Sequence, residues 1–206
     1  MEIINNILYY LDPVVIIKAL GLFGVLFIVF AESGLFFGFF LPGDSLLFTA
    51  GFLASQNFLD ISFLAVGAFL CAVLGDSVGY WFGKKIGPKI FNKEDSFFFH
   101  KKHIVEAQTF YNKYGNKTIF LARFVPVVRT FAPIVAGVGQ MKYKNFIAYN
   151  LVGGFVWSFL LVFSGYFLGE IIPGVDKYLL PIILVIIVIS FLPIIFEVIK
   201  SKKKSK

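Results

Sequence analysis

The chain has 206 residues, of which 58% are hydrophobic and 15% are charged. Soluble domains carry about 25% charged residues, so this composition excludes the ordinary soluble class and predicts a membrane protein. Several apolar stretches approach the roughly 20 residues that a spanning helix needs. We therefore expect residues 1–206 to form one all-α, polytopic membrane domain.

The net charge of +7 comes mainly from lysines in the segment 84–117 and in the tail 200–206, which both flank apolar runs. This distribution is the positive-inside pattern, and no aromatic and basic RNA-binding motif accompanies it. We expect these lysines to meet anionic headgroups and not nucleic acid. Both segments are therefore placed in the cytoplasm, beside an inner (cytoplasmic) membrane.

In chain order, the first apolar stretch, residues 14–54, contains Glu32 and is then broken by Pro42-Gly43-Asp44. Its second arm, residues 46–54, would form only about 14 Å of helix, too short to cross a hydrocarbon core of about 30 Å. We predict a re-entrant hairpin over residues 22–56.

The next stretch, residues 61–82, is broken only by Asp76 and is long enough to span, at about 33 Å. Asp76 would lie one turn before the cytoplasmic end of this helix, and both an interfacial and a cavity-lining position stay open for it. The amphipathic spacing in residues 100–114 predicts a helix on the cytoplasmic surface, with residues 5–19 as its counterpart.

A second broken stretch, residues 119–138, holds two arginines and two prolines, a set that a straight lipid-facing helix would not tolerate. It predicts a second re-entrant hairpin over residues 118–141. Residues 146–168 and 178–199 then span the membrane. This even number of crossings returns the basic tail to the cytoplasm, whereas a full crossing of the second hairpin would put it outside.

Broken backbone at membrane depth has to be covered by protein or has to line a water-filled cavity, because an unpaired peptide group in lipid costs several kcal/mol. The two hairpins are therefore expected to face each other. Each precedes a spanning helix, and the two helices run in opposite directions. The plan is an inverted-topology repeat of residues 5–83 and 100–170, with the last helix as an addition.

Four charged residues fall inside these hairpins: Glu32, Asp44, Arg123 and Arg129. At about 2.5–3.5 kcal/mol each they would together cost about 10 kcal/mol if unpaired. Pairing the carboxylates with the arginines across the hairpin interface removes that cost and gives neutrality. Such pairs could simply lock the hairpins together, but a buried ion pair is often no better for stability than apolar packing, which favours a functional role.

The choice of arginine is informative, because seventeen of the nineteen basic residues are lysine and both arginines lie in the second hairpin. Arginine offers a planar, permanently charged fork that binds phosphate or carboxylate through two hydrogen bonds. A carboxylate in low dielectric holds its proton unless an arginine lies close, so proton exchange could accompany phosphate binding. The predicted roles are phosphate binding by Arg123 and Arg129, counter-charge or proton coupling by Glu32 and Asp44, hairpin shaping by Pro42, Gly43, Pro126 and Pro133, and support by Asn150 and Asp76.

Several short motifs join these residues: Leu41-Pro42-Gly43-Asp44, then Phe120 to Pro126 with Arg129-Thr130, then Gly137-Val138-Gly139 and Phe146 to Asn150 with Trp157. Together with Glu32 they make the chain similar to the DedA family, also called SNARE-associated or VTT-domain membrane proteins. The resemblance extends over about residues 21–169. It implies two re-entrant hairpins in an inverted repeat, and lipid translocation, notably of undecaprenyl phosphate in bacteria and of phospholipids in eukaryotic relatives.

The resulting hypothesis is a flippase or scramblase-like transporter of a lipid phosphate, with protons and the bilayer as further partners and with a homo-oligomer left open. The alternative is a proton-coupled carrier of small ions or organic cations, with the carboxylates as binding groups. An enzyme is not expected, because no Ser/His/Asp set gathers in the apolar segments. Neither a cofactor nor a metal is expected, since His100 and His103 lack a third ligand.

Overall fold

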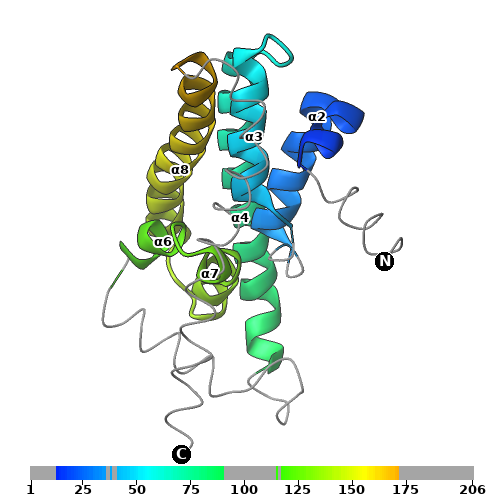
Figure 1. Ribbon diagram of the computed structural model, residues 1–206. Coiled ribbons are helices and arrows are strands. Elements are labelled where there is room, and N and C mark those ends of the chain that lie inside the picture. Colours follow the sequence, from blue (N-terminus) through cyan, green and yellow to red (C-terminus); the bar gives the residue numbers. More distant parts are fainter. Residues whose placement is uncertain (1–12, 36–37, 39–40, 91–114, 116, 172–206) are drawn as a thin grey trace, which may run out of the picture. The chain divides into compact units, whose positions relative to one another are not determined.

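The computed structural model of the protein describes residues 13–35, 38, 41–90, 115 and 117–171. Every element in that part is a helix: α2 (Pro13–Gly34), α3 (Gly43–Ser55), α4 (Ile61–Ile90), α6 (Lys117–Ala122), α7 (Pro126–Val138) and α8 (Tyr143–Ile171) (Figure 1). Three of them, α2, α4 over Ile61–Ile86, and α8, are long and apolar enough to cross a membrane. The protein is therefore an all-α, multi-pass membrane protein, as predicted.

Some predicted segments lie outside the described residues. They are the first part of the helix over 5–19, the surface helix over 100–114 with His100 and His103, the last spanning helix over 178–199, and the tail 200–206.

The helices α4 and α8 both extend beyond the apolar runs, 61–82 and 146–168, that predicted them. α4 begins where Asp60 Oδ1 accepts hydrogen bonds from the backbone N–H groups of Ser62 (2.8 Å) and Phe63 (3.0 Å), an N-cap. It continues to Ile90, so the predicted end at Phe82 is wrong, because lysines that close an apolar run are themselves good helix formers. Asp76 consequently lies in the middle of α4 and not near its end.

The first predicted hairpin corresponds to the second arm of α2 and to α3. α2 consists of two helices joined at Gly21, whose φ of 61° is a conformation that glycine adopts at little cost. α3 starts directly after Pro42, where the Ser45 hydroxyl donates to the Pro42 carbonyl (3.0 Å). It ends before Asn57, which has a φ of 61° and turns the chain toward α4.

The second predicted hairpin corresponds to α6 and α7, two short helices that pack against each other (Figure 1). Val125 between them is extended, with a φ of −117°, as a residue that precedes proline tends to be. Pro126 opens α7 at the one place in a helix where a missing N–H is harmless. After α7, Gln140 with a φ of 54° reverses the chain into α8.

The chain divides into two compact units. The first unit comprises residues 1–28, 42–68 and 158–206, and the second comprises residues 29–41 and 69–157. The long helices α2, α4 and α8 each contribute one segment to each unit, while α3 belongs to the first and α6 and α7 to the second.

Each unit contains a short helix that crosses a long helix through two glycines. In the first unit, a Cβ added to Gly51 of α3 would lie 2.0 Å from the Val162 carbonyl oxygen, and one added to Gly165 of α8 would lie 2.0 Å from the Phe48 carbonyl oxygen. In the second unit, a Cβ added to Gly83 of α4 would lie 2.0 Å from the Ile134 carbonyl oxygen. A Cβ added to Gly137 of α7 would lie 2.0 Å from the Tyr80 carbonyl oxygen. The absent side chains let the two backbones touch.

A buried aromatic cluster holds the turn between α7 and α8 against α4. The Tyr80 hydroxyl donates to the Met141 carbonyl, and the Tyr80 ring stacks on Phe146 with centroids 4.7 Å apart. Tyr143 packs against Tyr80 as well and donates to Ser77 Oγ at 3.3 Å. These contacts fix where α8 begins relative to α4 within the second unit.

The crossing of α4 and α7 predicts opposite effects for two neighbouring glycines. Gly83→Ala places a methyl group against backbone and should lower the free energy of unfolding by about 1–3 kcal/mol. A methyl group from Gly79→Ala, one turn earlier in α4, would have its nearest neighbour, Pro133 Cβ, at 3.4 Å, which is an ordinary contact distance, so this change should be neutral or slightly stabilising. Thermal unfolding of the two detergent-solubilised variants checks this, and equal melting temperatures would refute the close crossing.

Candidate functional site

Among the described residues of the second unit, four charged side chains are buried. Glu32 lies in the last turn of α2, Asp76 in the middle of α4, Arg123 directly after α6 and Arg129 in the first turn of α7. Their side chains keep only 2–4% of their surface exposed. Two positive and two negative charges thus lie in the interior of an apolar, membrane-spanning protein, where each needs a partner.

The four charges form two ion pairs. Arg129 donates to Glu32, and Arg123 donates to Asp76. Arg123 is also attracted by Glu32 and repelled by Arg129, so the two pairs interact. The pairing of the arginines with buried carboxylates balances the charge of the site at zero.

The partner of Arg123 is a residue to which the sequence analysis gave no such role. Asp76 was expected at the interface or on a cavity wall, whereas it lies buried against Arg123. The signal was present, because Asp76 is the one acidic residue in an otherwise apolar run. The pairing was missed because the predicted helix end at Phe82 placed Asp76 close to the membrane surface.

Asn150 and two glycines of α8 complete the surroundings of Arg123. Arg123 Nη2 donates to Asn150 Oδ1 at 2.6 Å, and Asn150 Nδ2 donates to the Val73 carbonyl of α4 at 3.1 Å. A Cβ added to Gly153 would lie 3.5 Å from Arg123 Cδ, and one added to Gly154 would lie 3.5 Å from Arg123 Nη1. The glycines therefore leave room for the guanidinium, and Asn150 orients it.

One indole ring serves both arginines. The Trp157 ring centroid lies 4.7 Å from the guanidinium carbon of Arg129 and 5.8 Å from that of Arg123. The face of an aromatic ring attracts a cation without offering a hydrogen bond that competes with an anion. Both guanidinium groups thus lie beside the Trp157 ring. The sequence motifs include Trp157 but did not predict this contact.

Part of the hydrogen-bonding capacity at the Arg123–Asp76 pair is unused. In the part of the chain that the structure describes, neither Arg123 Nη1 nor Asp76 Oδ1 has a hydrogen-bond partner, although both atoms are buried. A buried guanidinium N–H that donates to nothing is costly. It can donate to an additional anionic oxygen without first losing a bond.

The other predicted site residues lie at the starts of α3 and α7, except Pro133, which lies inside α7. Asp44 is half-buried in the first turn of α3, in the first unit, directly after Pro42 and Gly43. Pro126 is the first residue of α7, and Pro133 lies inside it, four residues after Arg129. Pro133 therefore cannot donate a hydrogen bond to the Arg129 carbonyl, as a residue at that position of a regular helix would.

Comparison with known proteins places these residues in a family. The VTT domain matches residues 41–167. The chain is 43% identical to the protein DedA of Escherichia coli (strain K12) over 206 residues, which cover 98% of this chain and 94% of that protein. The chain belongs to the DedA family of VTT-domain membrane proteins.

Other relatives have names that state a membrane location and no substrate. An uncharacterized membrane protein of Mycobacterium tuberculosis (strain H37Rv) is 46% identical over 191 residues, with 89% of this chain and 83% of that protein covered. An uncharacterized membrane protein of Synechocystis is 34% identical over 133 residues, with 64% and 61% covered. No solved structure matches the chain significantly.

The Arg123–Asp76 pair predicts a recoverable loss of stability. Arg123→Met alone leaves Asp76 buried without a counter-charge and should lower the free energy of unfolding by about 3–5 kcal/mol. The double variant Arg123→Met with Asp76→Leu removes both charges and should regain most of that loss. Thermal unfolding in detergent checks this, with exposed Lys144→Met as the matched control. A double variant less stable than the single one would show that the pair is not an isolated unit.

Proposed function

We propose that the protein translocates a lipid phosphate, such as undecaprenyl phosphate or a related phospholipid, across the cytoplasmic membrane. The observation that carries the proposal is the pair of buried arginines on one indole ring, inside apolar helices and neutralised by two carboxylates. Family membership agrees with it, although the names of the relatives specify no cargo.

Arginine is suited to this task because its fork binds two phosphate oxygens at once and stays charged at any physiological pH. The carboxylates keep the empty site neutral, so the site is stable at membrane depth without a substrate. An incoming phosphate replaces a carboxylate as the partner of an arginine and so enters without adding net charge. Arg123 Nη1, which has no hydrogen-bond partner in the described part of the chain, supplies a first contact.

Protons enter the scheme through the displaced carboxylate. A carboxylate that loses its arginine in a low-dielectric site takes up a proton, because the charged form is then poorly solvated. Glu32 and Asp44 are the proposed proton carriers. Asp76 joins them because it contacts Arg123 directly. Lipid movement would in this way be coupled to a proton gradient. The protein would act as a carrier and not as an enzyme.

The proposed architecture is an inverted repeat with two re-entrant hairpins. α3 and α7 have 13 residues each, or about 20 Å of helix, which is too short for a core of about 30 Å. The glycine crossings support the repeat: Gly83 is residue 23 of α4, counted from Ile61, and Gly165 is residue 23 of α8, counted from Tyr143. The two long helices thus meet a short helix at the same position.

The transport activity should depend on both arginines. In proteoliposomes with labelled undecaprenyl phosphate, Arg123→Ala and Arg129→Ala should slow translocation at least about 10-fold, because a lost bidentate contact to phosphate costs more than about 1.4 kcal/mol. The double variant with Arg123→Met and Asp76→Leu should be folded and equally inactive, which separates transport from stability. Lys142→Ala, an exposed charge outside the site, is the control.

Wild-type rates in Arg129→Ala would overturn the proposed phosphate site. Glu32→Gln and Asp44→Asn should lose the dependence on a pH gradient, and full gradient-dependent transport in both would refute the proton coupling. Movement of an organic cation that needs Glu32 and neither arginine would instead identify a cation carrier.

The hairpin topology predicts the side from which cysteines are labelled. In a Cys71→Ala background, a cysteine at Lys117 and one at Lys142 should react with an impermeant maleimide from the same, cytoplasmic side. A cysteine at Asn57, in the turn between α3 and α4, should react from the opposite side. Labelling of positions 117 and 142 from opposite sides would mean that α6 and α7 cross the membrane.

A further inference from the structure

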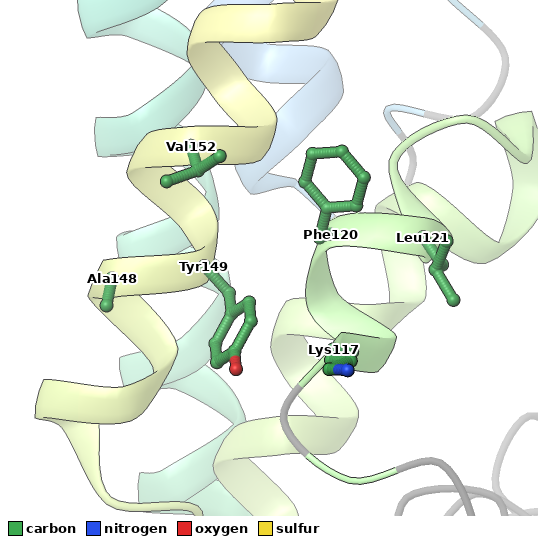
Figure 2. Close-up of a pocket in the computed structure, with 6 residues that line it drawn as sticks. All are labelled: Lys117, Phe120, Leu121, Ala148, Tyr149 and Val152. Atoms are coloured by element: carbon green, nitrogen blue, oxygen red, sulfur yellow. The ribbon is translucent and has the colours of Figure 1, made fainter.

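An apolar groove lies between α6 and α8 in the second unit, apart from the two ion pairs. It encloses about 530 Å³, within the range of about 300–1,000 Å³ that small-molecule sites occupy. The residues that line it are Lys117, Phe120, Leu121, Ala148, Tyr149 and Val152 (Figure 2).

The surface of the groove is almost wholly apolar, and two polar groups of its lining residues lie beside one end of it. The Lys117 ammonium and the Tyr149 hydroxyl lie at the same end, where α6 begins, and Phe120 and Val152 lie at the other (Figure 2). None of the described residues that line the groove is acidic, so Lys117 has no counter-charge among them. An occupant that complements both ends has an anionic head and a hydrocarbon chain.

The groove opens toward the region where lipid is expected. Leu121 and Val152, which form its rim, are each 57% exposed and belong to helices of a membrane domain. Exposed apolar side chains on a spanning helix face hydrocarbon and not water. An acyl or isoprenoid chain can therefore reach the groove sideways from the bilayer, while its head stays near Lys117.

Phe120 separates this groove from the arginine site. Its ring lines the groove, and Arg123 follows it by three residues, at the end of the same short helix. A Cβ added to Gly153 of α8 would lie 3.5 Å from both Phe120 Cα and Arg123 Cδ, so α6 and α8 are in close contact here. The groove and the phosphate fork thus lie on neighbouring sides of a single helical turn.

We propose that the groove is a docking site for an anionic lipid with a single phosphate, drawn laterally from the surrounding bilayer. Lys117 and the Tyr149 hydroxyl hold the phosphate, and Phe120, Ala148 and Val152 hold the upper part of one chain. Transfer of the phosphate from Lys117 to Arg123 would be the next step. Only that step rests on the proposed transport function.

A photoreactive lipid tests the docking site. Full-length protein is reconstituted in nanodiscs with phosphatidic acid that carries a diazirine in one acyl chain, and adducts are mapped by mass spectrometry. Adducts should concentrate on α6 and the first half of α8, at several times the yield given by the matching phosphatidylcholine probe. Lys117→Gln should lower the phosphatidic acid yield to the phosphatidylcholine level, whereas exposed Lys144→Gln should leave it unchanged.

A steric variant gives a second, independent arm. Val152→Trp fills the groove and should abolish the adducts with either probe, and Leu151→Trp, the exposed neighbour that does not line the groove, should not. Unchanged yields in Val152→Trp, or adducts spread evenly over exposed residues such as Leu160 and Phe167, would overturn the docking site. So would an unchanged yield in Lys117→Gln.

The two proposals fail separately. If the protein moves no lipid in proteoliposomes but gives Lys117-dependent adducts in the groove, the transport proposal fails and the docking site stands. If lipid moves at the wild-type rate in Val152→Trp and no adduct maps to the groove in wild-type protein, the docking site fails and the arginine site stands. Arg129→Ala should stop transport and leave the adduct yield unchanged.

Discussion

Two guanidinium groups are buried among apolar helices, and the packing of the second unit depends on this constraint. Arginine cannot lose its charge, so the chain has to bring a carboxylate to each one. Glu32 and Asp76 lie far from the arginines in sequence, and the ion pairs therefore tie the end of α2 and the middle of α4 to α6 and α7. The broken helices follow from the same need, because each arginine lies at or beside a helix end.

Close helix approach makes these pairs possible. Gly83 and Gly137 let α4 and α7 touch, and Gly153 and Gly154 leave space for Arg123 beside α8. Small residues at helix contacts are the usual means of packing in lipid, where the hydrophobic effect does not press helices together. Here they have a second consequence, which is that polar side chains from several helices reach one another in a buried interior, where water cannot replace a missing partner.

The two carboxylates neutralise the two arginines, and this neutrality serves both the stability of the site and the proposed activity. A site with unpaired arginines would bind phosphate tightly but would be costly to hold in the membrane, whereas a site whose carboxylates can be exchanged for phosphate avoids both problems. Trp157 contributes because the face of its ring attracts both guanidiniums. With the groove on the neighbouring side of α6, the proposed lipid would have a surface for its phosphate and a surface for its chain within one helical turn.

The sequence by itself determined the membrane class, the all-α composition and the broken character of the segment around Arg123 and Arg129. These follow from hydropathy, proline and charge, which act over neighbouring residues. Family membership was also readable, because the motifs from Pro42 to Trp157 are contiguous stretches. Helix ends were less certain, since a helix such as α4 continues through lysines that end the apolar run.

Only the tertiary structure decided which residues meet the arginines. From the sequence alone, Glu32 and Asp44 were the expected partners of the two arginines, and Asp76 was not among them. The contact of Arg123 with Asp76 and Asn150 depends on how α4, α6 and α8 cross, and the shared indole ring depends on the rotation of α8 about its axis. Such contacts join residues dozens of positions apart, and local pattern carries no information about them. Two arginines can lie in an apolar segment because the helix crossings place both guanidinium groups against carboxylates and one aromatic face.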